Sequence, residues 1–248
     1  MLDDITPLIL TRDEEANIGG TLAQLAWARE VVVVDSMSGD RTPEIAWSFP
    51  NVRFVQRPFD THAAQWAFGA SLVTTEWTLT LDADYFVPEE LVQELATLDG
   101  KAAAYEATFR YAVNGKTLRA SLYPPRAVLL RRGRFEFWQD GHTQRVRIDG
   151  PIAQLRTPMI HDDRKDLGRF VSRQRAYMRE EAAKLRATPF ASLNAMGKLR
   201  TLRVVAPLAV LVYTLLVKRT ILDGRAGWRY AWERFLAECM LAGELWRG

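Results

Sequence analysis

The sequence predicts an α/β protein whose sheet is mostly parallel, followed by a basic, amphipathic helical tail. Three observations support this fold class. Short β-branched and apolar runs alternate with helical patterns over residues 1–100, three of these runs end in polar or acidic residues, and residues 164–248 combine excess positive charge with the most apolar run of the chain. Alternation of strands and helices gives right-handed crossovers that leave successive strands parallel.

The first 100 residues alternate between the two kinds of element. Strands are expected at 7–10, 31–34, 52–55 and 78–81, and helices at 18–25, 43–49 and 89–98. The second of these strands is an uninterrupted valine run, which is typical of a strand covered on both faces. Because the carboxyl ends of parallel strands share one edge of the sheet, the polar residues that follow the strands should converge on one crevice.

The second half is expected to be mixed. Strands are predicted at 103–111, 126–131 and 144–148, with Asn114-Gly115 as a hairpin turn. A helix with a basic side should begin near Leu167. Asp162 or Asp163 just before it would either cap the helix or take part in acceptor or diphosphate binding.

The net charge of +3 hides an asymmetry between two parts of the chain. Residues 1–163 carry 16 Lys and Arg against 23 Asp and Glu, whereas residues 164–248 carry 17 against 7. A basic segment favours nucleic acid or an anionic membrane surface as partner. Because the basic tail also holds the most apolar run and no nucleic-acid motif accompanies it, we expect lipid and no nucleic acid.

Several classes of protein are disfavoured by what the sequence lacks. Cys239 is the single cysteine, which excludes an internal disulfide framework and a cysteine-based zinc site. Neither a Gly-x-Gly-x-x-Gly motif after the first strand nor a P-loop is present, so a dinucleotide oxidoreductase or a P-loop enzyme is disfavoured. The N-terminus lacks the pattern of a secretory signal, and we therefore expect the chain in the cytoplasm.

Asp82 and Asp84 follow a buried strand directly. On an extended chain they lie on the same side, since side chains alternate with period two, and both could face one divalent cation. Carboxylates in this number suit Mg²⁺ or Mn²⁺ that carries substrate phosphates. The alternative is an Asp-rich turn without a ligand, because Asp is common in turns.

Three segments in this order resemble the family-2 glycosyltransferases with the GT-A fold. They are residues 10–18, residues 31–42 and residues 81–84. The resemblance implies a Rossmann-like, mostly parallel mixed sheet and a nucleotide-diphosphate sugar donor held with Mn²⁺ or Mg²⁺. It also implies the site residues: Thr11, Arg12, Glu14, Asp35, Gln65 and Asp82 at the nucleotide sugar, and Asp84 with Asp82 at the metal.

Sugar transfer with inversion needs a base that removes the proton of the acceptor hydroxyl. The closer resemblance is to a bacterial lipopolysaccharide-core glucosyltransferase-like subgroup, where a Val-His-Glu motif occupies the region of His142. In this chain Thr143 stands in place of that Glu. Asp140 is therefore the first candidate for the base, and His142 is an alternative base or a diphosphate or metal contact. Asp140 could also be a turn carboxylate only.

The tail has an apolar run at residues 204–217 with cations on both sides. The run is shorter than the roughly 20 residues that a spanning helix needs, so it is either a buried core helix or an interfacial one. The basic surroundings favour the interfacial reading. Trp228, Trp232 and Trp246 would suit the headgroup level of a bilayer, although a helical core would hold tryptophan equally well.

Together these features predict a metal-dependent inverting glycosyltransferase that acts on a glycolipid or cell-envelope saccharide. A catalytic domain is expected at 1–163, with its nucleotide-sugar half at 1–100 and its acceptor half at 101–163, and a membrane-surface segment at 164–248. The protein would be cytoplasmic and peripheral on the inner face of the cell membrane. Two alternatives remain: a polyprenyl-phosphate glycosyltransferase, or a membrane scaffold that binds nucleotide sugar without transferring it.

Overall fold

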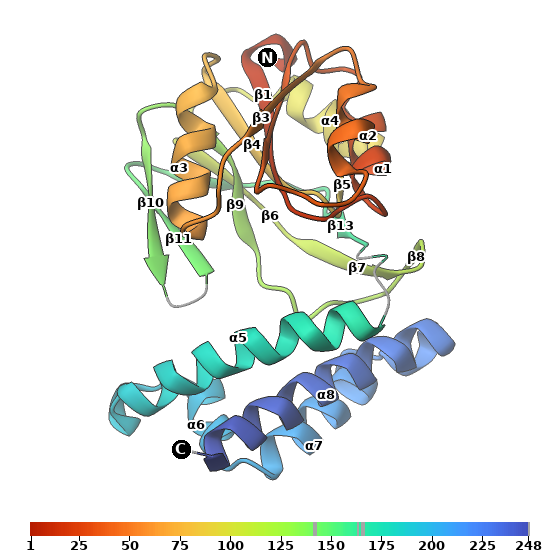
Figure 1. The fold of residues 1–248 in the computed structure, drawn as a ribbon, viewed down its shortest axis with the longest axis vertical. Helices are drawn as coiled ribbons and strands as arrows, with labels where there is room; N and C mark the ends of the chain where they lie inside the picture. Colours follow the sequence, from red (N-terminus) through yellow and green to blue (C-terminus); the bar gives the residue numbers. More distant parts are fainter. Residues whose placement is uncertain (141–142, 163, 165–166, 248) are drawn as a thin grey trace. The chain divides into compact units, whose positions relative to one another are not determined.

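The computed structural model describes residues 1–140, 143–162, 164 and 167–247. The chain divides into two compact units (Figure 1). The first unit comprises Met1–Tyr111 and Tyr123–Arg164, and the second comprises Ala112–Leu122 and Lys165–Gly248. The second unit therefore takes in a short segment from the middle of the chain.

The centre of the first unit is a seven-stranded sheet with the strand order β12-β6-β9-β4-β1-β2-β3. Strands β1, β2, β3 and β4 are parallel to one another, β9 runs antiparallel to β4 and β6, and β12 is parallel to β6. The predicted mostly parallel mixed sheet is confirmed. Its strands are β1 (Ile5–Thr11), β2 (Val31–Asp35), β3 (Val52–Gln56), β4 (Trp77–Asp82), β6 (Ala104–Ala107), β9 (Arg126–Arg131) and β12 (Ile152–Gln154).

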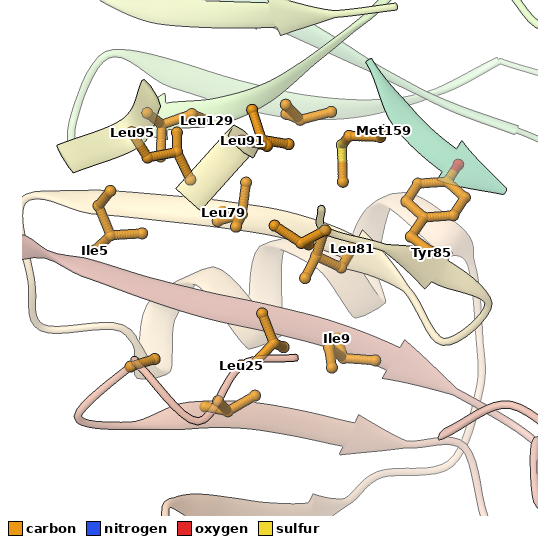
Figure 2. Packing of buried hydrophobic residues seen from close by; sticks show 14 of the residues in the cluster. Ile5, Ile9, Leu25, Leu79, Leu81, Tyr85, Leu91, Leu95, Leu129 and Met159 are labelled. Carbon is orange, nitrogen blue, oxygen red and sulfur yellow. The ribbon is translucent and has the colours of Figure 1, made fainter. Parts of the chain in front are cut away.

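Helices cover both faces of this sheet, as the apolar pattern requires (Figure 1). One face carries alternate strand residues such as Ile9, Val33 and Leu81, which pack with α1 (Ile18–Ala23), α2 (Thr42–Trp47) and α4 (Glu89–Thr97). Figure 2 shows part of this cluster, with Leu91 and Leu95 of α4 beside Leu79 of β4. The opposite face packs Leu8, Val32 and Val34 with Trp66 of α3 (His62–Leu72).

The second half differs from the prediction in two places. The expected strand at 103–111 is broken into β6 and β7 (Phe109–Val113), which belong to different sheets. A strand that was not predicted, β10 (Phe135–Asp140), forms a hairpin with β11 (Thr143–Ile148). Trp66 of α3 stacks on Phe137 of this hairpin.

A small sheet of order β5-β13-β7-β8 completes the strands, with β5 (Tyr85–Phe86), β8 (Lys116–Thr117) and β13 (Met159–His161). The predicted hairpin turn is confirmed between β7 and β8, where Asn114 and Gly115 both have positive φ. β5 pairs with β13 so that Tyr85 lies opposite His161. This pairing brings together two segments that are far apart in the sequence.

The second unit is helical apart from its β-hairpin segment. α5 (Leu167–Ala187) packs along α8 (Arg225–Arg247), and α7 (Val205–Val212) packs along α8 as well (Figure 1). The other elements are α6 (Ala195–Thr201), the π-helical turn η3 (Tyr213–Val217) and the 3₁₀ turns η2 (Phe190–Ser192) and η4 (Thr220–Asp223). Among the helices that the structure describes, none combines the length and apolar character needed to cross a bilayer.

Candidate active site at the carboxyl edge of the sheet

Strand register places three of the predicted site residues side by side. Thr11 at the end of β1 pairs with Asp35 at the end of β2, and the preceding Leu10 pairs with Asp82 at the end of β4. The predicted convergence of polar strand ends on one edge of the sheet is therefore confirmed. Parallel strands make this edge the place where an α/β sheet binds its ligands.

Asp35 is wholly buried and fixes the loop that follows β2. Its Oδ1 accepts a hydrogen bond from Ser38 Oγ at 2.5 Å, and its Oδ2 accepts from Ser38 N at 2.9 Å and from Gln56 Nε2 at 3.0 Å. Gln65 of α3, also wholly buried, donates to Ser36 Oγ at 3.0 Å. Asp35 and Gln65 thus both hold this loop through hydrogen bonds.

The loop after β1 is interlocked with the loop after β2. Asp13 N donates to Ser38 Oγ at 2.8 Å, and Glu14 N donates to Thr42 Oγ1 at 2.7 Å. Glu14 is buried and accepts from Asn17 Nδ2 at 2.9 Å. Arg12, in contrast, is exposed on this loop.

Thr11 is buried at the centre of this edge. Its Oγ1 has no hydrogen-bond partner within the part of the chain that the structure describes. A buried hydroxyl without a partner is uncommon in folded proteins. Of the predicted residues on the two loops, Arg12 is the exposed one, while Asp35 and Glu14 are bonded within the loops.

Asp84 lies in the turn after β4 and is largely buried. Its Oδ2 is 3.2 Å from Nε2 of His161, and the two side chains are 11% and 16% exposed. The backbone around the pair is also fixed, because Asp162 N donates to Asp84 O at 3.0 Å and Thr21 Oγ1 donates to Ala83 O at 2.6 Å. Asp82, two residues earlier, is partly buried.

The sequence did not single out His161 as a site residue. Its ring lies among three tyrosines, with centroid distances of 5.3 Å to Tyr85, 4.9 Å to Tyr111 and 5.3 Å to Tyr123. The signal in the sequence was weak, because a lone His before a predicted helix has no partner that sequence spacing reveals. Only the pairing of β5 with β13 brings it to Asp84.

Arg126, at the start of β9, was also missed. Its Nη1 donates to Tyr123 Oη at 2.8 Å and Tyr85 Oη at 3.3 Å, and these two hydroxyls are 2.7 Å apart. The side-chain amide of Gln144 is oriented so that its Oε1 accepts hydrogen bonds from Arg126 Nη2 at 2.8 Å and from Trp66 Nε1 at 3.0 Å. The signal in the sequence was an arginine directly before the apolar residues 127–130 of a predicted strand.

The charges around this arginine change three pKa values. Burial, and then the negative charge of Asp82, raises the pKa of Tyr85 well above its ordinary value, and the pKa of Tyr123 is raised for the same reasons. Burial opposes the charged form of Arg126, but the two tyrosines and Asp82 outweigh it, so that its pKa is raised. Arg126 therefore stays a cation within electrostatic reach of Asp82.

The remaining predicted residues lie elsewhere. Asp140 ends β10 and pairs with Thr143 of β11, and its Oδ2 accepts from Arg145 Nε at 3.0 Å. His142 lies outside the described residues, as does Asp163. Asp162 is buried and accepts from Arg164 Nε at 2.9 Å.

The donor set at Asp84 fits a divalent cation in kind. It offers carboxylate oxygen from Asp84 and imidazole nitrogen from His161, with the Asp82 carboxylate two residues away, and such ligands suit Mn²⁺ and, for the oxygens, Mg²⁺. Within residues 1–140, 143–162, 164 and 167–247, however, no group of three or more His, Cys, Asp or Glu side chains is arranged to hold a metal ion. An open set of few protein ligands is usual where substrate phosphates complete the shell.

Comparisons with known proteins agree with this arrangement. An uncharacterized glycosyltransferase of Rickettsia typhi is 35% identical over 92 residues, which are 37% of this chain and 30% of the relative. The lipopolysaccharide core biosynthesis glycosyltransferase LpsC of Rhizobium meliloti is 25% identical over 182 residues, 64% of this chain and 65% of LpsC. The match therefore spans about a third of the length of the Rickettsia relative.

The fold has a counterpart among solved structures. TarS residues 1–349 of S. aureus, in complex with UDP-GlcNAc, superimposes with a TM-score of 0.50 at 14% identity, covering 98% of this chain and 91% of that one. At this identity the likeness shows a shared GT-A fold. The family model described as "Glycosyl transferase family 2" matches residues 8–159, which include Thr11, Asp35 and Asp82, and the chain belongs to that family.

Proposed function

We propose that this protein transfers a sugar, with inversion, from a nucleotide-diphosphate sugar to a saccharide or glycolipid of the cell envelope. The observation that carries the proposal is the alignment of Thr11, Asp35 and Asp82 at one sheet edge, with Asp84 in the next turn. Membership of glycosyl transferase family 2 supports the reaction class. The similarity to LpsC, named for lipopolysaccharide core biosynthesis, supports an envelope saccharide as acceptor.

In this proposal the two interlocked loops hold the nucleotide. Arg12 is exposed and would contact it directly, with the adjoining Thr11. Asp35, Glu14 and Gln65 already bond to neighbouring loop atoms, and they would act by keeping the loops in the binding conformation. Preorganised loops of this kind lower the ordering cost of ligand binding.

Asp84 would hold a divalent cation, Mn²⁺ or Mg²⁺, with help from Asp82 and with His161 as the third protein group. Bound there, the ion would supply positive charge that stabilises the departing nucleoside diphosphate. Asp84 and His161 are already in contact, and their backbones are tied by Asp162 N and by the β5–β13 pairing. The backbone that carries both residues is therefore already fixed, and the side chains would have to rearrange to surround the ion.

Asp140 remains our candidate for the general base. It lies on the β10–β11 hairpin, which is anchored to α3 by the bond from Ala63 N to Gln139 Oε1 at 3.0 Å and by the stacking of Phe137 on Trp66. Arg145 stabilises the charged carboxylate of Asp140. Asp140 would therefore accept a proton only after a substrate displaces or shares that arginine.

Replacing Asp140 with Asn tests this role. Transfer should collapse while donor binding stays intact, because the change removes only the basic oxygen. Glu136→Gln is the matched control, since Glu136 is an exposed acid on the same hairpin with an arginine partner of its own. Near-normal turnover of the Asp140→Asn protein would remove Asp140 from the mechanism.

The proposed activity is tested with a panel of nucleotide sugars in the presence of Mn²⁺ or Mg²⁺. Thermal stabilisation and donor turnover are measured for the natural protein and for Asp84→Ala. We expect one donor class to stabilise and turn over in a metal-dependent way that Asp84→Ala abolishes. Tight donor binding with no turnover under any condition would instead favour a non-catalytic nucleotide-sugar-binding scaffold.

We further place the reaction at a membrane, with the protein peripheral on its inner face. The motivation is the acceptor, since an envelope glycolipid is carried in lipid. The basic composition of residues 164–248 is consistent with an anionic surface.

A further inference from the structure

We infer that an exposed apolar stripe on α7 and η3 inserts in the plane of a bilayer surface, and that the cations at its two ends select anionic lipid. This deepens the peripheral association proposed above by naming the surface and the class of lipid. It concerns only the second unit of the chain.

The stripe consists of Val205, Leu208, Val212 and Leu216. They recur at intervals of three and four residues, which places them on one face of a helix. Their exposed fractions are 49%, 55%, 53% and 60%, whereas Ala206, Pro207, Val210 and Thr214 on the same helical segment are buried. The helix is therefore packed on one side and presents a row of large apolar side chains on the other.

Further apolar side chains extend the exposed surface on both sides of the stripe in the sequence. They are Leu202, Val204, Val217 and Leu222, and all four are more than half exposed. Single exposed apolar residues are ordinary, but a contiguous set in one unit indicates a binding surface.

Charge identifies what covers this surface. Residues 182–222 contain seven Lys and Arg and no Asp or Glu. Arg203 lies two residues before the start of α7 and Arg219 two residues after the end of η3, and both are exposed. In the part of the chain that the structure describes, neither has a carboxylate within ion-pair distance.

Local backbone geometry does not explain why arginine stands at these two positions. Arg203 has φ 50° and Arg219 has φ 56°, a region that favours glycine or asparagine. Lys218 lies between the stripe and Arg219, with its Nζ 5.8 Å from the ring centroid of Tyr213. Cations that bracket an apolar helix are the pattern of an interfacial helix on anionic lipid.

The length of the segment fits an in-plane position. Residues 205–217 form a continuous helical stretch that, at ~1.5 Å per residue, is about 20 Å long, short of the ~30 Å hydrocarbon core. The polar ends would stay at headgroup level while the stripe enters the acyl boundary. Trp228 and Trp232, half exposed and one turn apart on α8, have the amphipathic rings typical of that level.

A second copy of the chain is the main competing occupant. A symmetric pairing through this face would bring each copy's Arg203, Lys218 and Arg219 close to the same cations of the other, with no acid in residues 182–222 to neutralise them. Like charges across an interface oppose association. The surface charge therefore favours an anionic partner over self-association.

The test measures binding of the full chain to vesicles by flotation, without nucleotide sugar. Vesicles of phosphatidylcholine alone are compared with vesicles of phosphatidylcholine mixed with phosphatidylglycerol. We expect binding to the mixed vesicles, weak binding to the neutral ones, and loss of the difference at high salt, since salt screens the attraction.

Two double variants separate the contributions. Leu208→Ser with Leu216→Ser should weaken binding to mixed vesicles at least about tenfold, from the apolar area no longer buried. Arg203→Gln with Arg219→Gln should weaken it about twenty-fivefold, at about fivefold per cation, and leave binding to neutral vesicles unchanged. Trp47→Ser and Arg132→Gln are the controls, because these residues are an exposed Trp and an exposed Arg of the first unit.

Equal binding to neutral and anionic vesicles would overturn the inference, and so would no binding to either. Sedimentation experiments test the competing occupant. If the chain self-associates, and if Leu208→Ser with Leu216→Ser abolishes this association, the stripe binds a second copy of the chain instead. The outcome is separate from the proposed catalysis, because donor turnover without vesicles depends on Asp84 and should be normal in both double variants.

Discussion

Replacing Arg126 with Gln should destabilise the first unit and at the same time strengthen the binding of a divalent cation beside Asp82. Arg126 is a partly buried cation that bonds the hydroxyls of Tyr123 and Tyr85 and is attracted to Asp82. Gln is shorter and neutral. It can replace neither the forked geometry nor the charge.

The magnitude follows from the bonds that are lost. The two shorter contacts, to Tyr123 Oη and to the Gln144 amide oxygen, are both 2.8 Å long. Hydrogen bonds to a charged group contribute about 1.5–3 kcal/mol each, and Gln recovers part of one, so the expected loss of unfolding free energy is about 2–4 kcal/mol. Arg131→Gln is the matched control on the same strand, because its partner Glu76 is 49% exposed and such surface pairs contribute about 0–1 kcal/mol.

Urea denaturation at neutral pH, followed by near-ultraviolet circular dichroism, gives the stability difference. The cation readout is Mn²⁺ binding in the absence of donor, which should tighten in Arg126→Gln because a competing positive charge beside Asp82 is gone. If Arg126→Gln lowers the free energy of unfolding no more than Arg131→Gln does, the hydrogen bonds of Arg126 do not stabilise the first unit. Weaker Mn²⁺ binding by a folded Arg126→Gln protein would show that the charge of Arg126 does not oppose a cation beside Asp82.

Two further predictions concern the second unit and the tyrosines. A Cβ at position 227 would lie 1.7 Å from Thr220 O, so Gly227→Ala should sharply lower the melting temperature, whereas Gly243→Ala, with open space around it on the same helix, should change it little or raise it slightly. Because burial raises the folded-state pKa of Tyr85 and Tyr123, the stability that they contribute is present below their unfolded pKa of about 10 and is lost as pH rises above it. Tyr85→Phe should flatten this alkaline loss in denaturation series across pH, and an unchanged profile would contradict it.

The sheet and its functional edge could be predicted because their signals are local. The Val31–Asp35 strand is a continuous run that ends in a carboxylate, and β1 and β4 also end in polar residues, Thr11 and Asp82. Parallel connectivity then determines that these ends meet, and the register confirms it. Periodicity within each segment was enough for this part of the fold.

Contacts that depend on distant pairing could not be predicted in the same way. His161 reaches Asp84, 77 residues earlier in the chain, only because β13 pairs with β5. Strand β10 was missed because its burial alternates only weakly, with Glu136 and Trp138 exposed and Phe137 covered by α3. Arg126 looked like an ordinary strand residue until Tyr123 and Tyr85 were placed around it.

The helical tail shows where composition was informative and where it was not. Its basic excess and its apolar run were evident from the sequence, but the two readings of residues 204–217 could not be separated. In the structure the segment is packed on one side only, with Val210 and Thr214 buried and Leu208 and Leu216 exposed. Helix packing in three dimensions decides which side is covered, and the sequence period alone does not say what covers the other.

The proposed role of the turn after β4 is tested most directly by measuring Mn²⁺ binding in the presence of a nucleoside diphosphate. Electron paramagnetic resonance gives this binding. We predict that Mn²⁺ and the diphosphate bind together, and that Asp84→Asn and His161→Gln each weaken this binding at least about tenfold while Asp99→Asn, a surface control, leaves it unchanged. Equal binding by Asp84→Asn and the natural protein would contradict the claim that the turn after β4 holds the metal and the diphosphate.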